Sequence, residues 1–394
     1  MIRLLSYEGV LTVVCMIIGL AIAFNLNCRR KSKSKRQKKL GFIELFAGRD
    51  PIVDIIAIHG LDGHREQSWT AEDGTMWLKD LLPGDFPNAR ILSYGYDADT
   101  RSFAQTSTQT IFHHAVAFAE ELSMLRRANP KRPIIFLAHS LGGIIFKRAL
   151  IHCHTQGFKT NRHLRDIYTS TVAVLFFGTP HSGANGAQLA EWMGRVLSVY
   201  MYTNNRVLKD LNRDSSELEN IQQLYLPASE RLNTVFFHEE YETPIVGGMR
   251  KLIVPRHLAV IQGDRDARAT ALHADHCDMV KYIREGDINY QIVADYLMEL
   301  MEKATATAEE NWFQEDGHRS VAKGEPVPIQ QATSPKPLLP VSRNYVQRQY
   351  IYDFLTKRLL PSTPPKQQPR CILHGLGGGG KTQAAAFWIE ENKD

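Results

Sequence analysis

Short apolar runs alternate with longer amphipathic segments from Asp50 onward. The short runs are rich in β-branched and aromatic residues and are bounded by Gly, Pro or polar residues, which is typical of strands. The longer segments have the spacing of helices. Continuous apolar strands that alternate with helices predict a parallel sheet covered on both faces. The predicted strands are 52–59, 89–96, 133–138, 171–178, 233–239 and a sixth at 256–263, and helices are predicted at 110–128, 142–156 and 288–304.

The domain boundaries follow from the same pattern. Residues 184–232 have helical patterns between two predicted strands, where a cap or lid would be inserted. Five prolines between Pro326 and Pro340 predict an extended linker. We therefore expect an α/β domain at 50–304, a linker at 305–340 and a second segment at 341–394.

The N-terminus contains an uncharged apolar run, Val10 to Leu26, of seventeen residues. This length is at the short end of the roughly 17–25 residues that cross a bilayer. Positive charge follows the run and no small-residue cleavage site stands out, which favours a signal anchor over a cleaved signal peptide. We predict a transmembrane anchor at 1–28, a basic juxtamembrane segment at 29–49 and a cytosolic remainder. The endoplasmic reticulum and the mitochondrial outer membrane both fit, and a cleaved or non-inserted segment is the alternative.

The net charge of +5 comes from one local tract, because residues 29–39 hold eight Lys or Arg and no acid. The rest of the chain has a net charge of −3 once those eight are set aside. This distribution argues against a nucleic-acid partner. The five cysteines are scattered and odd in number, which argues against a disulfide framework or zinc site and fits a reducing compartment.

The stretch "IIFLAHSLGG" has a serine at the end of a predicted buried strand. The pattern G-x-S-x-G places a nucleophilic serine in a sharp strand-to-helix turn, with the next backbone N–H, here that of Leu141, facing the developing oxyanion. Ala138 replaces the first glycine and adds only a methyl group, while Gly142 and Gly143 allow close packing. Ser140 is therefore a candidate nucleophile; the alternative is a serine that only caps the following helix.

Further candidates lie in the flanking loops. "IHGLDGH" ends the first predicted strand, where the N–H of Leu61 could complete an oxyanion hole with that of Leu141. His59 in this motif is expected to shape the loop. The general base should follow the last strand, in "LHADHCDMVKYI", where we prefer His276 to His273 because it lies at the turn into a helix.

The acid of such a triad is open from the residues alone. "FFHEEYETP" offers Glu239, Glu240 and Glu242 after the appropriate strand. Asp264 and Asp266 in "VIQGDRDA" are rivals. A surface carboxylate is the ordinary interpretation for any one of the five.

The motifs "IHGLDGH", "FLAHSLGGIIFKRAL", "FFGTPHSGA" and "DHCDMVKY" resemble those of the serine-active-site-containing, lipase-like α/β hydrolases. Inositol deacylases and the SesB-type domains of fungal NLR-like proteins are related to them. The resemblance covers about residues 50–304 and implies an α/β-hydrolase fold, esterase or lipase-like activity without a cofactor, and no metal. It also implies Glu242 as the acid, since the family has "FYET" at the place of Tyr241–Thr243.

A glycine-rich loop, "GLGGGGKT", satisfies G-x-x-x-x-G-K-[ST] between a strand-like and a helix-like segment. Gly375 and Gly380 would let backbone N–H groups hold phosphate, Lys381 would neutralise it and Thr382 would bind Mg²⁺. The segment resembles the start of NB-ARC signalling NTPases. The twelve residues after Thr382 contain no Walker B aspartate, so we expect poor order and no ATP or ADP binding with Mg²⁺ unless the domain were completed.

Two functions follow from these features. The first is a membrane-anchored serine hydrolase that cleaves acyl esters, with membrane lipid as anchor and candidate substrate. The second is a signalling module in which the hydrolase fold serves binding, with partners that bind the linker and the C-terminal segment. The fold by itself does not identify the substrate.

Overall fold

The structure is a computed structural model that divides into two compact units, Met1–Pro328 and Ile329–Asp394. The residues described are 40–98, 108–157, 161–181, 186–200, 215–256, 258–259, 268–323, 347–360, 371 and 381–392.

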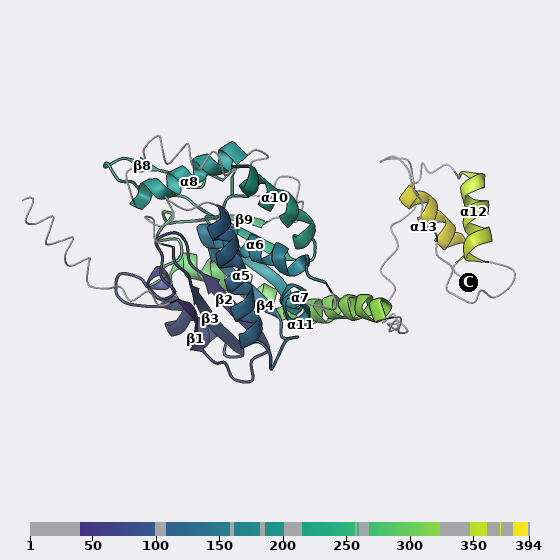
Figure 1. Ribbon diagram of the computed structural model, residues 1–394, viewed down its shortest axis with the longest axis horizontal. Coiled ribbons are helices and arrows are strands. Elements are labelled where there is room, and N and C mark those ends of the chain that lie inside the picture. Colours follow the sequence, from purple (N-terminus) through teal and green to yellow (C-terminus); the bar gives the residue numbers. More distant parts are fainter. Residues whose placement is uncertain are drawn as a thin grey trace, which may run out of the picture. The chain divides into compact units, whose positions relative to one another are not determined.

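The first unit is built on a seven-stranded sheet with the order β1-β3-β2-β4-β5-β6-β9 (Figure 1). Neighbouring strands from β3 to β9 are parallel, and only the edge strand β1 is antiparallel to its neighbour β3. The sheet is the mostly parallel one that the sequence predicts. Its strands are β1 (Gly41–Phe46), β2 (Val53–Ile58), β3 (Ala89–Gly95), β4 (Ile134–His139), β5 (Thr171–Phe177), β6 (Asn233–Glu239) and β9 (Arg268–Leu272).

Both faces of the sheet are covered, which explains why its central strands carry apolar side chains on both faces. In β2, Ile56 and Ile58 pack on one face and Ile55 and Ala57 on the other, because successive side chains of a strand point in opposite directions. The first face carries α5 (Thr108–Leu125), α6 (Leu141–His154), α7 (Arg162–Ser170), α8 (Gly186–Tyr200) and α10 (Ser215–Ser229), and the second carries α2 (Trp77–Asp80), α3 (Leu82–Asp85) and α11 (Ile288–Lys323).

The predicted cap segment between β5 and β6 contains the helices α8 and α10. They lie along the upper edge of the unit in Figure 1, and α10 packs against α6. Tyr225 of α10 is fully buried. A short hairpin of β7 (Thr243–Pro244) and β8 (Arg250–Lys251) follows β6.

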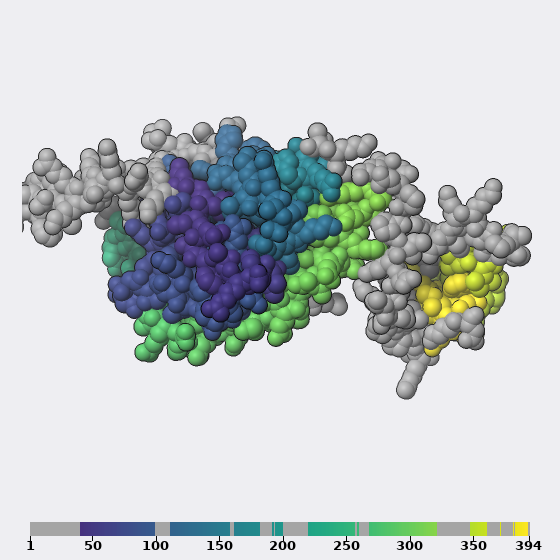
Figure 2. All heavy atoms as spheres, turned by 90° about the horizontal axis from the view of Figure 1, so that it is seen from below, coloured from purple at the N-terminus to yellow at the C-terminus, as the bar shows by residue number. Residues whose placement is uncertain are grey.

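Two predicted boundaries of this domain are wrong. β1 lies in the predicted juxtamembrane segment 29–49, and its Glu44 forms an ion pair with Arg90 of β3. α11 was expected to end at Ala304 but continues to Lys323, through half of the predicted linker 305–340. Both β1 and α11 lie on the surface of the unit seen from below (purple and green, Figure 2).

The prediction of a sixth strand at 256–263 is also wrong for the described residues of that segment. Arg256, Leu258 and Ala259 lie in a turn, and the remaining residues of that segment lie outside the described ranges. The last strand is β9, whose first four residues are only partly buried or exposed. An edge strand of this kind needs no continuous apolar run, so its sequence gives little signal.

The second unit contains two helices in its described part, α12 (Gln349–Leu359) and α13 (Lys381–Glu391). They pack against each other, and Trp388 Nε1 donates a hydrogen bond to Thr356 Oγ1 at 2.9 Å. The expected helix after the glycine-rich loop is therefore present.

The membrane prediction concerns residues outside the described ranges, because the apolar run Val10–Leu26 precedes Leu40. Across the described ranges, no helix combines the length and the apolar character needed to cross a membrane. Cys153, Cys277 and Cys371, the cysteines within those ranges, are free thiols.

Candidate active site

Ser140 occupies the turn between β4 and α6, at the carboxyl end of the central strands. Its backbone has φ 52° and ψ −121°, a combination that non-glycine residues rarely adopt. Its N–H donates to the carbonyl oxygen of Phe177 at 2.8 Å, which ties the turn to β5. The motif "AHSLG" thus forms the strained elbow that G-x-S-x-G predicts.

The small residues around Ser140 are required by close contacts. A Cβ atom on Gly142 would lie 2.5 Å from the carbonyl oxygen of His59, and one on Gly143 would lie 2.2 Å from Thr179 Oγ1. Both distances are far too short, so only glycine fits. Ala138 is fully buried within β4, which accommodates its methyl group at the position of the missing glycine.

His276 lies in the loop after β9 and joins Ser140 to a carboxylate. Its Nε2 accepts a hydrogen bond from Ser140 Oγ at 3.0 Å, and its Nδ1–H donates to Glu239 Oε2 at 2.9 Å. All three side chains are buried. The structure therefore brings together the predicted Ser140 and His276, while His273 is half-exposed and pairs with Glu240.

The carboxylate beside His276 is Glu239 and not the predicted Glu242. Glu242 is exposed, and its backbone carbonyl accepts a hydrogen bond from Arg250. Glu239 is the last residue of β6, on the face of the strand that turns toward the His276 loop. The rivals Asp264 and Asp266 lie outside the described residues.

Glu239 accepts hydrogen bonds from two backbone N–H groups as well as from the His276 ring. Its Oε1 accepts hydrogen bonds from the backbone N–H groups of Ile253 and Val254, the latter at 2.7 Å. These two residues follow the β7–β8 hairpin. A carboxylate that accepts three N–H groups has a fixed orientation toward His276.

The predicted oxyanion donors lie on either side of the serine turn. Leu61 follows β2 and Leu141 begins α6, and both residues are buried. Within the described ranges, neither backbone N–H donates to a protein acceptor. A first-turn helical N–H such as that of Leu141 has no partner inside its own helix.

His59 shapes the loop that carries Leu61. Its Nδ1–H donates to the carbonyl oxygen of Gly60 at 2.9 Å, and its ring stacks on Tyr96 with centroids 4.4 Å apart. Burial lowers the pKa of His59 to about 4, so the ring is neutral at physiological pH. This agrees with the predicted structural role.

The predicted phosphate loop lies mostly outside the described residues, including Gly375 and Gly380. Lys381 and Thr382 are described and form the first turn of α13. Of the strand-like segment before the loop, only Cys371 is described. Among the residues described, no group of three or more His, Cys, Asp or Glu side chains is placed to hold a metal ion.

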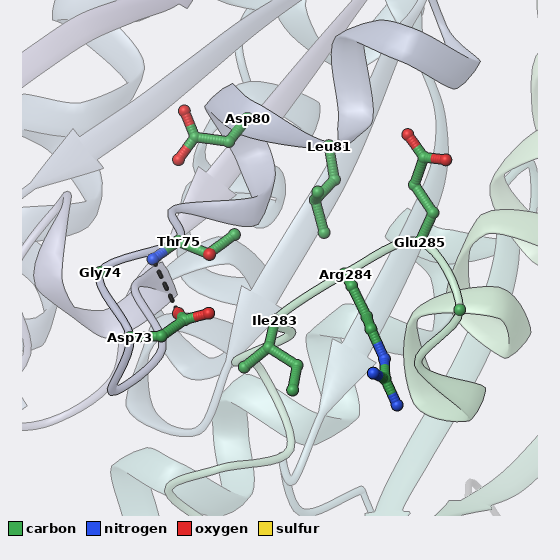
Figure 3. Close-up of a pocket in the computed structure, with 9 residues that line it drawn as sticks. Asp73, Gly74, Thr75, Asp80, Leu81, Ile283, Arg284 and Glu285 are labelled. Carbon is green, nitrogen blue, oxygen red and sulfur yellow. Dashed lines mark hydrogen bonds between the residues drawn. The ribbon is translucent and has the colours of Figure 1, made fainter.

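A separate surface hollow of about 690 Å³ lies between the loop that carries Asp73 and the loop before α11 (Figure 3). Asp73 and Asp80 line one side, and Arg284 and Glu285 line the other. Ser140, His276 and Glu239 do not line it. It belongs to a different part of the surface from the serine.

Comparison with known proteins found relatives that are similar over part of their length. No protein-family model matches the chain. Protein SERAC1 of Mus musculus is 29% identical over 224 residues, which cover 51% of this chain and 32% of the relative. Protein SERAC1 of Homo sapiens is 26% identical over 274 residues, which cover 64% of this chain and 39% of the relative. The aligned part thus spans between about a third and two fifths of these relatives.

Solved structures to which this chain is similar include a Bacillus licheniformis lipase, BlEst2, at 16% identity and a TM-score of 0.42, covering 65% of this chain and 97% of that one. The NocB thioesterase domain is 12% identical with a TM-score of 0.36, covering 66% of this chain and 99% of that domain. The fold assignment rests on this chain itself. Its sheet order, the strained serine between β4 and α6, and the buried hydrogen bonds from Ser140 to Glu239 are those of the α/β-hydrolase fold.

Proposed function

We propose that this protein is a serine hydrolase that cleaves acyl esters with Ser140 as nucleophile, His276 as general base and Glu239 as the acid. The observation that carries the proposal is the continuous buried chain of hydrogen bonds, 3.0 Å from Ser140 Oγ to His276 Nε2 and 2.9 Å from His276 Nδ1 to Glu239 Oε2. A serine that only capped α6 would need no such chain, and Ser140 makes no side-chain cap hydrogen bond.

The reaction follows from these contacts. Ser140 Oγ attacks the ester carbonyl carbon as its proton passes to His276 Nε2, and Glu239 stabilises the imidazolium that forms. His276 then gives the proton to the leaving alcohol, which leaves an acyl-serine. Water attacks this acyl group with His276 again as base, which releases the carboxylic acid and restores Ser140.

The N–H groups of Leu61 and Leu141 are proposed to stabilise the tetrahedral oxyanion. Their lack of protein acceptors in the described ranges leaves them available to a substrate oxygen. Such fixed donors supply a large share of the rate enhancement in acyl transfer.

We further infer that the acyl ester belongs to a membrane lipid. The support is the apolar run Val10–Leu26, followed by the basic tract at 29–39, which together would hold the domain at a membrane surface. Single-pass anchoring, with the hydrolase on the cytosolic side, belongs to this proposal.

Replacement of Ser140 by alanine tests the proposal. We expect Ser140→Ala to lose covalent labelling by a fluorophosphonate probe and to lower the hydrolysis of p-nitrophenyl butyrate by at least about 10⁴-fold. Ser123→Ala is the matched control, because Ser123 is also a buried serine and its hydroxyl donates a hydrogen bond to the backbone carbonyl of Glu120. Labelling that is absent in the wild type would support a non-catalytic signalling module instead, and labelling that is unchanged in Ser140→Ala would show that Ser140 is not the nucleophile.

A further inference from the structure

The backbone of His276 is held on both sides by side chains from other elements. Its N–H donates to Thr243 Oγ1 at 2.9 Å, and its carbonyl oxygen accepts a hydrogen bond from His139 Nε2 at 2.9 Å. We propose that Thr243 is a positioning residue, whose hydroxyl oxygen fixes the loop that carries the base. The proposal rests on the proposed hydrolase function.

His276 needs such support because it lies in a loop rather than in a helix or strand. Asp275 Oδ1 accepts the N–H groups of Cys277 at 2.9 Å and Asp278 at 3.0 Å, which stabilises the turn after His276. The peptide nitrogen of His276 itself is held by Thr243. The His276 ring is hydrogen-bonded to Ser140 and to Glu239 at the same time. A small rotation of the His276 peptide would therefore lengthen one of these two hydrogen bonds.

The position of Thr243 is itself fixed by burial and by strand pairing. It is almost fully buried, at 1% exposure, and it pairs with Lys251 across the β7–β8 hairpin. Residues Ile253 and Val254, which leave the same hairpin, donate their N–H groups to Glu239. One short hairpin therefore holds both the acid and the loop of the base, and Thr243 sets the position of one relative to the other.

The hydroxyl oxygen, and not the volume of the side chain, carries this role. Valine has nearly the shape of threonine but no acceptor, so Thr243→Val would leave the buried N–H of His276 without a partner. The loop would then shift to reach another acceptor. Serine keeps the oxygen and loses only a methyl group.

The kinetic test compares Thr243→Val, Thr243→Ser and the control Thr171→Val in the 394-residue protein. Thr171 is equally buried and its hydroxyl bonds to the carbonyl of Ile167, at the opposite end of β5 from Ser140. For Thr243→Val we expect kcat on p-nitrophenyl butyrate to fall by about 10- to 100-fold, since displacement by about 1 Å can cost that much. KM should change by less than about 3-fold, because the side chain positions the base and does not contact substrate. Thr243→Ser and Thr171→Val should retain kcat to within about 3-fold.

A spectroscopic test reports the same contact without any substrate. The proton between His276 Nδ1 and Glu239 should give a downfield proton resonance, assigned by its loss in His276→Gln. We expect this resonance to shift or broaden in Thr243→Val and to remain in Thr243→Ser and Thr171→Val. If Thr243→Val does not fold, Thr243→Ala replaces it in both tests.

The outcomes separate this proposal from the proposed function. A Thr243→Val protein with an unchanged resonance, or with a kcat no lower than that of Thr171→Val, overturns the role of Thr243 while leaving the hydrolase proposal intact. Absence of labelling and hydrolysis in the wild type overturns the hydrolase proposal, and the resonance then still decides whether Thr243 positions His276.

Discussion

Three glutamates lie within four residues at the end of β6, and their surroundings differ sharply. Glu239 is 3% exposed and accepts hydrogen bonds from His276, Ile253 and Val254. The other two carboxylates, Glu240 and Glu242, are exposed. A buried carboxylate with several hydrogen bonds has a fixed position, from which it holds an imidazole in one tautomer and stabilises its charged form.

Replacing two of these glutamates by glutamine separates their roles. We expect Glu239→Gln to lower kcat by roughly 10³- to 10⁴-fold, because the amide cannot stabilise the imidazolium and can favour the wrong tautomer. Glu242→Gln, the matched change three residues away, should leave kcat within about 2-fold. Steady-state hydrolysis of p-nitrophenyl butyrate measures both, and a larger loss in Glu242→Gln than in Glu239→Gln would contradict the assignment.

At the scale of elements, the second half of α11 belongs to the folded unit. Trp312 is 5% exposed and its Nε1–H donates to Ser170 Oγ at 3.0 Å. Glu315 is fully buried between Arg165 and Arg319, at 3.1 Å and 3.0 Å. Because these charged residues are paired inside the protein, the polar composition of residues 305–323 does not indicate that the segment is packed against the unit.

Loss of these contacts should destabilise the unit. We expect a protein of residues 40–304 to be at least about 3 kcal/mol less stable than one of residues 40–323, because removal of Glu315 breaks its buried ion pair with Arg165 and removal of Trp312 opens the core. For a domain of this size that corresponds to a melting temperature lower by roughly 6–12 °C.

Differential scanning calorimetry measures the difference. The control is Asp316→Ala in the longer protein, since Asp316 pairs with Lys131 on the surface and such pairs contribute about 0–1 kcal/mol. Equal melting temperatures for the two lengths would show that α11 beyond Ala304 is dispensable.

At the scale of the whole molecule, we propose that an N-terminal anchor precedes a hydrolase unit in the sequence. Removal of residues 1–39 should release the protein from membranes while retaining its esterase activity, because β1 begins at Gly41 and stays intact. The basic tract alone binds lipid only reversibly. Membrane pelleting after a high-salt wash measures this, with the full-length chain as control. A truncated protein that still pellets would mean that another surface is the anchor.

Much of the first unit could be predicted from local patterns. The five parallel strands from β2 to β6 and the turn at Ser140 were each recognisable from a few consecutive residues. β9 and the second half of α11 were missed because their residues are mixed in polarity, whereas β1 (GFIELF) is mostly apolar and was assigned to the juxtamembrane segment beside the basic tract. They are stabilised by partners distant in the sequence, such as Arg90 for Glu44 and Arg165 for Glu315.

The buried parallel strands, the serine turn with its glycines and the order of serine and histidine follow from the amino-acid sequence, because they depend on side-chain size and polarity over short stretches. Which glutamate contacts His276 follows from the three-dimensional fold. The choice depends on Ile253, Val254 and Thr243, which reach Glu239 and His276 through the β7–β8 hairpin. Spacing along a chain identifies candidates for a site, whereas burial and hydrogen bonding between distant segments choose among them.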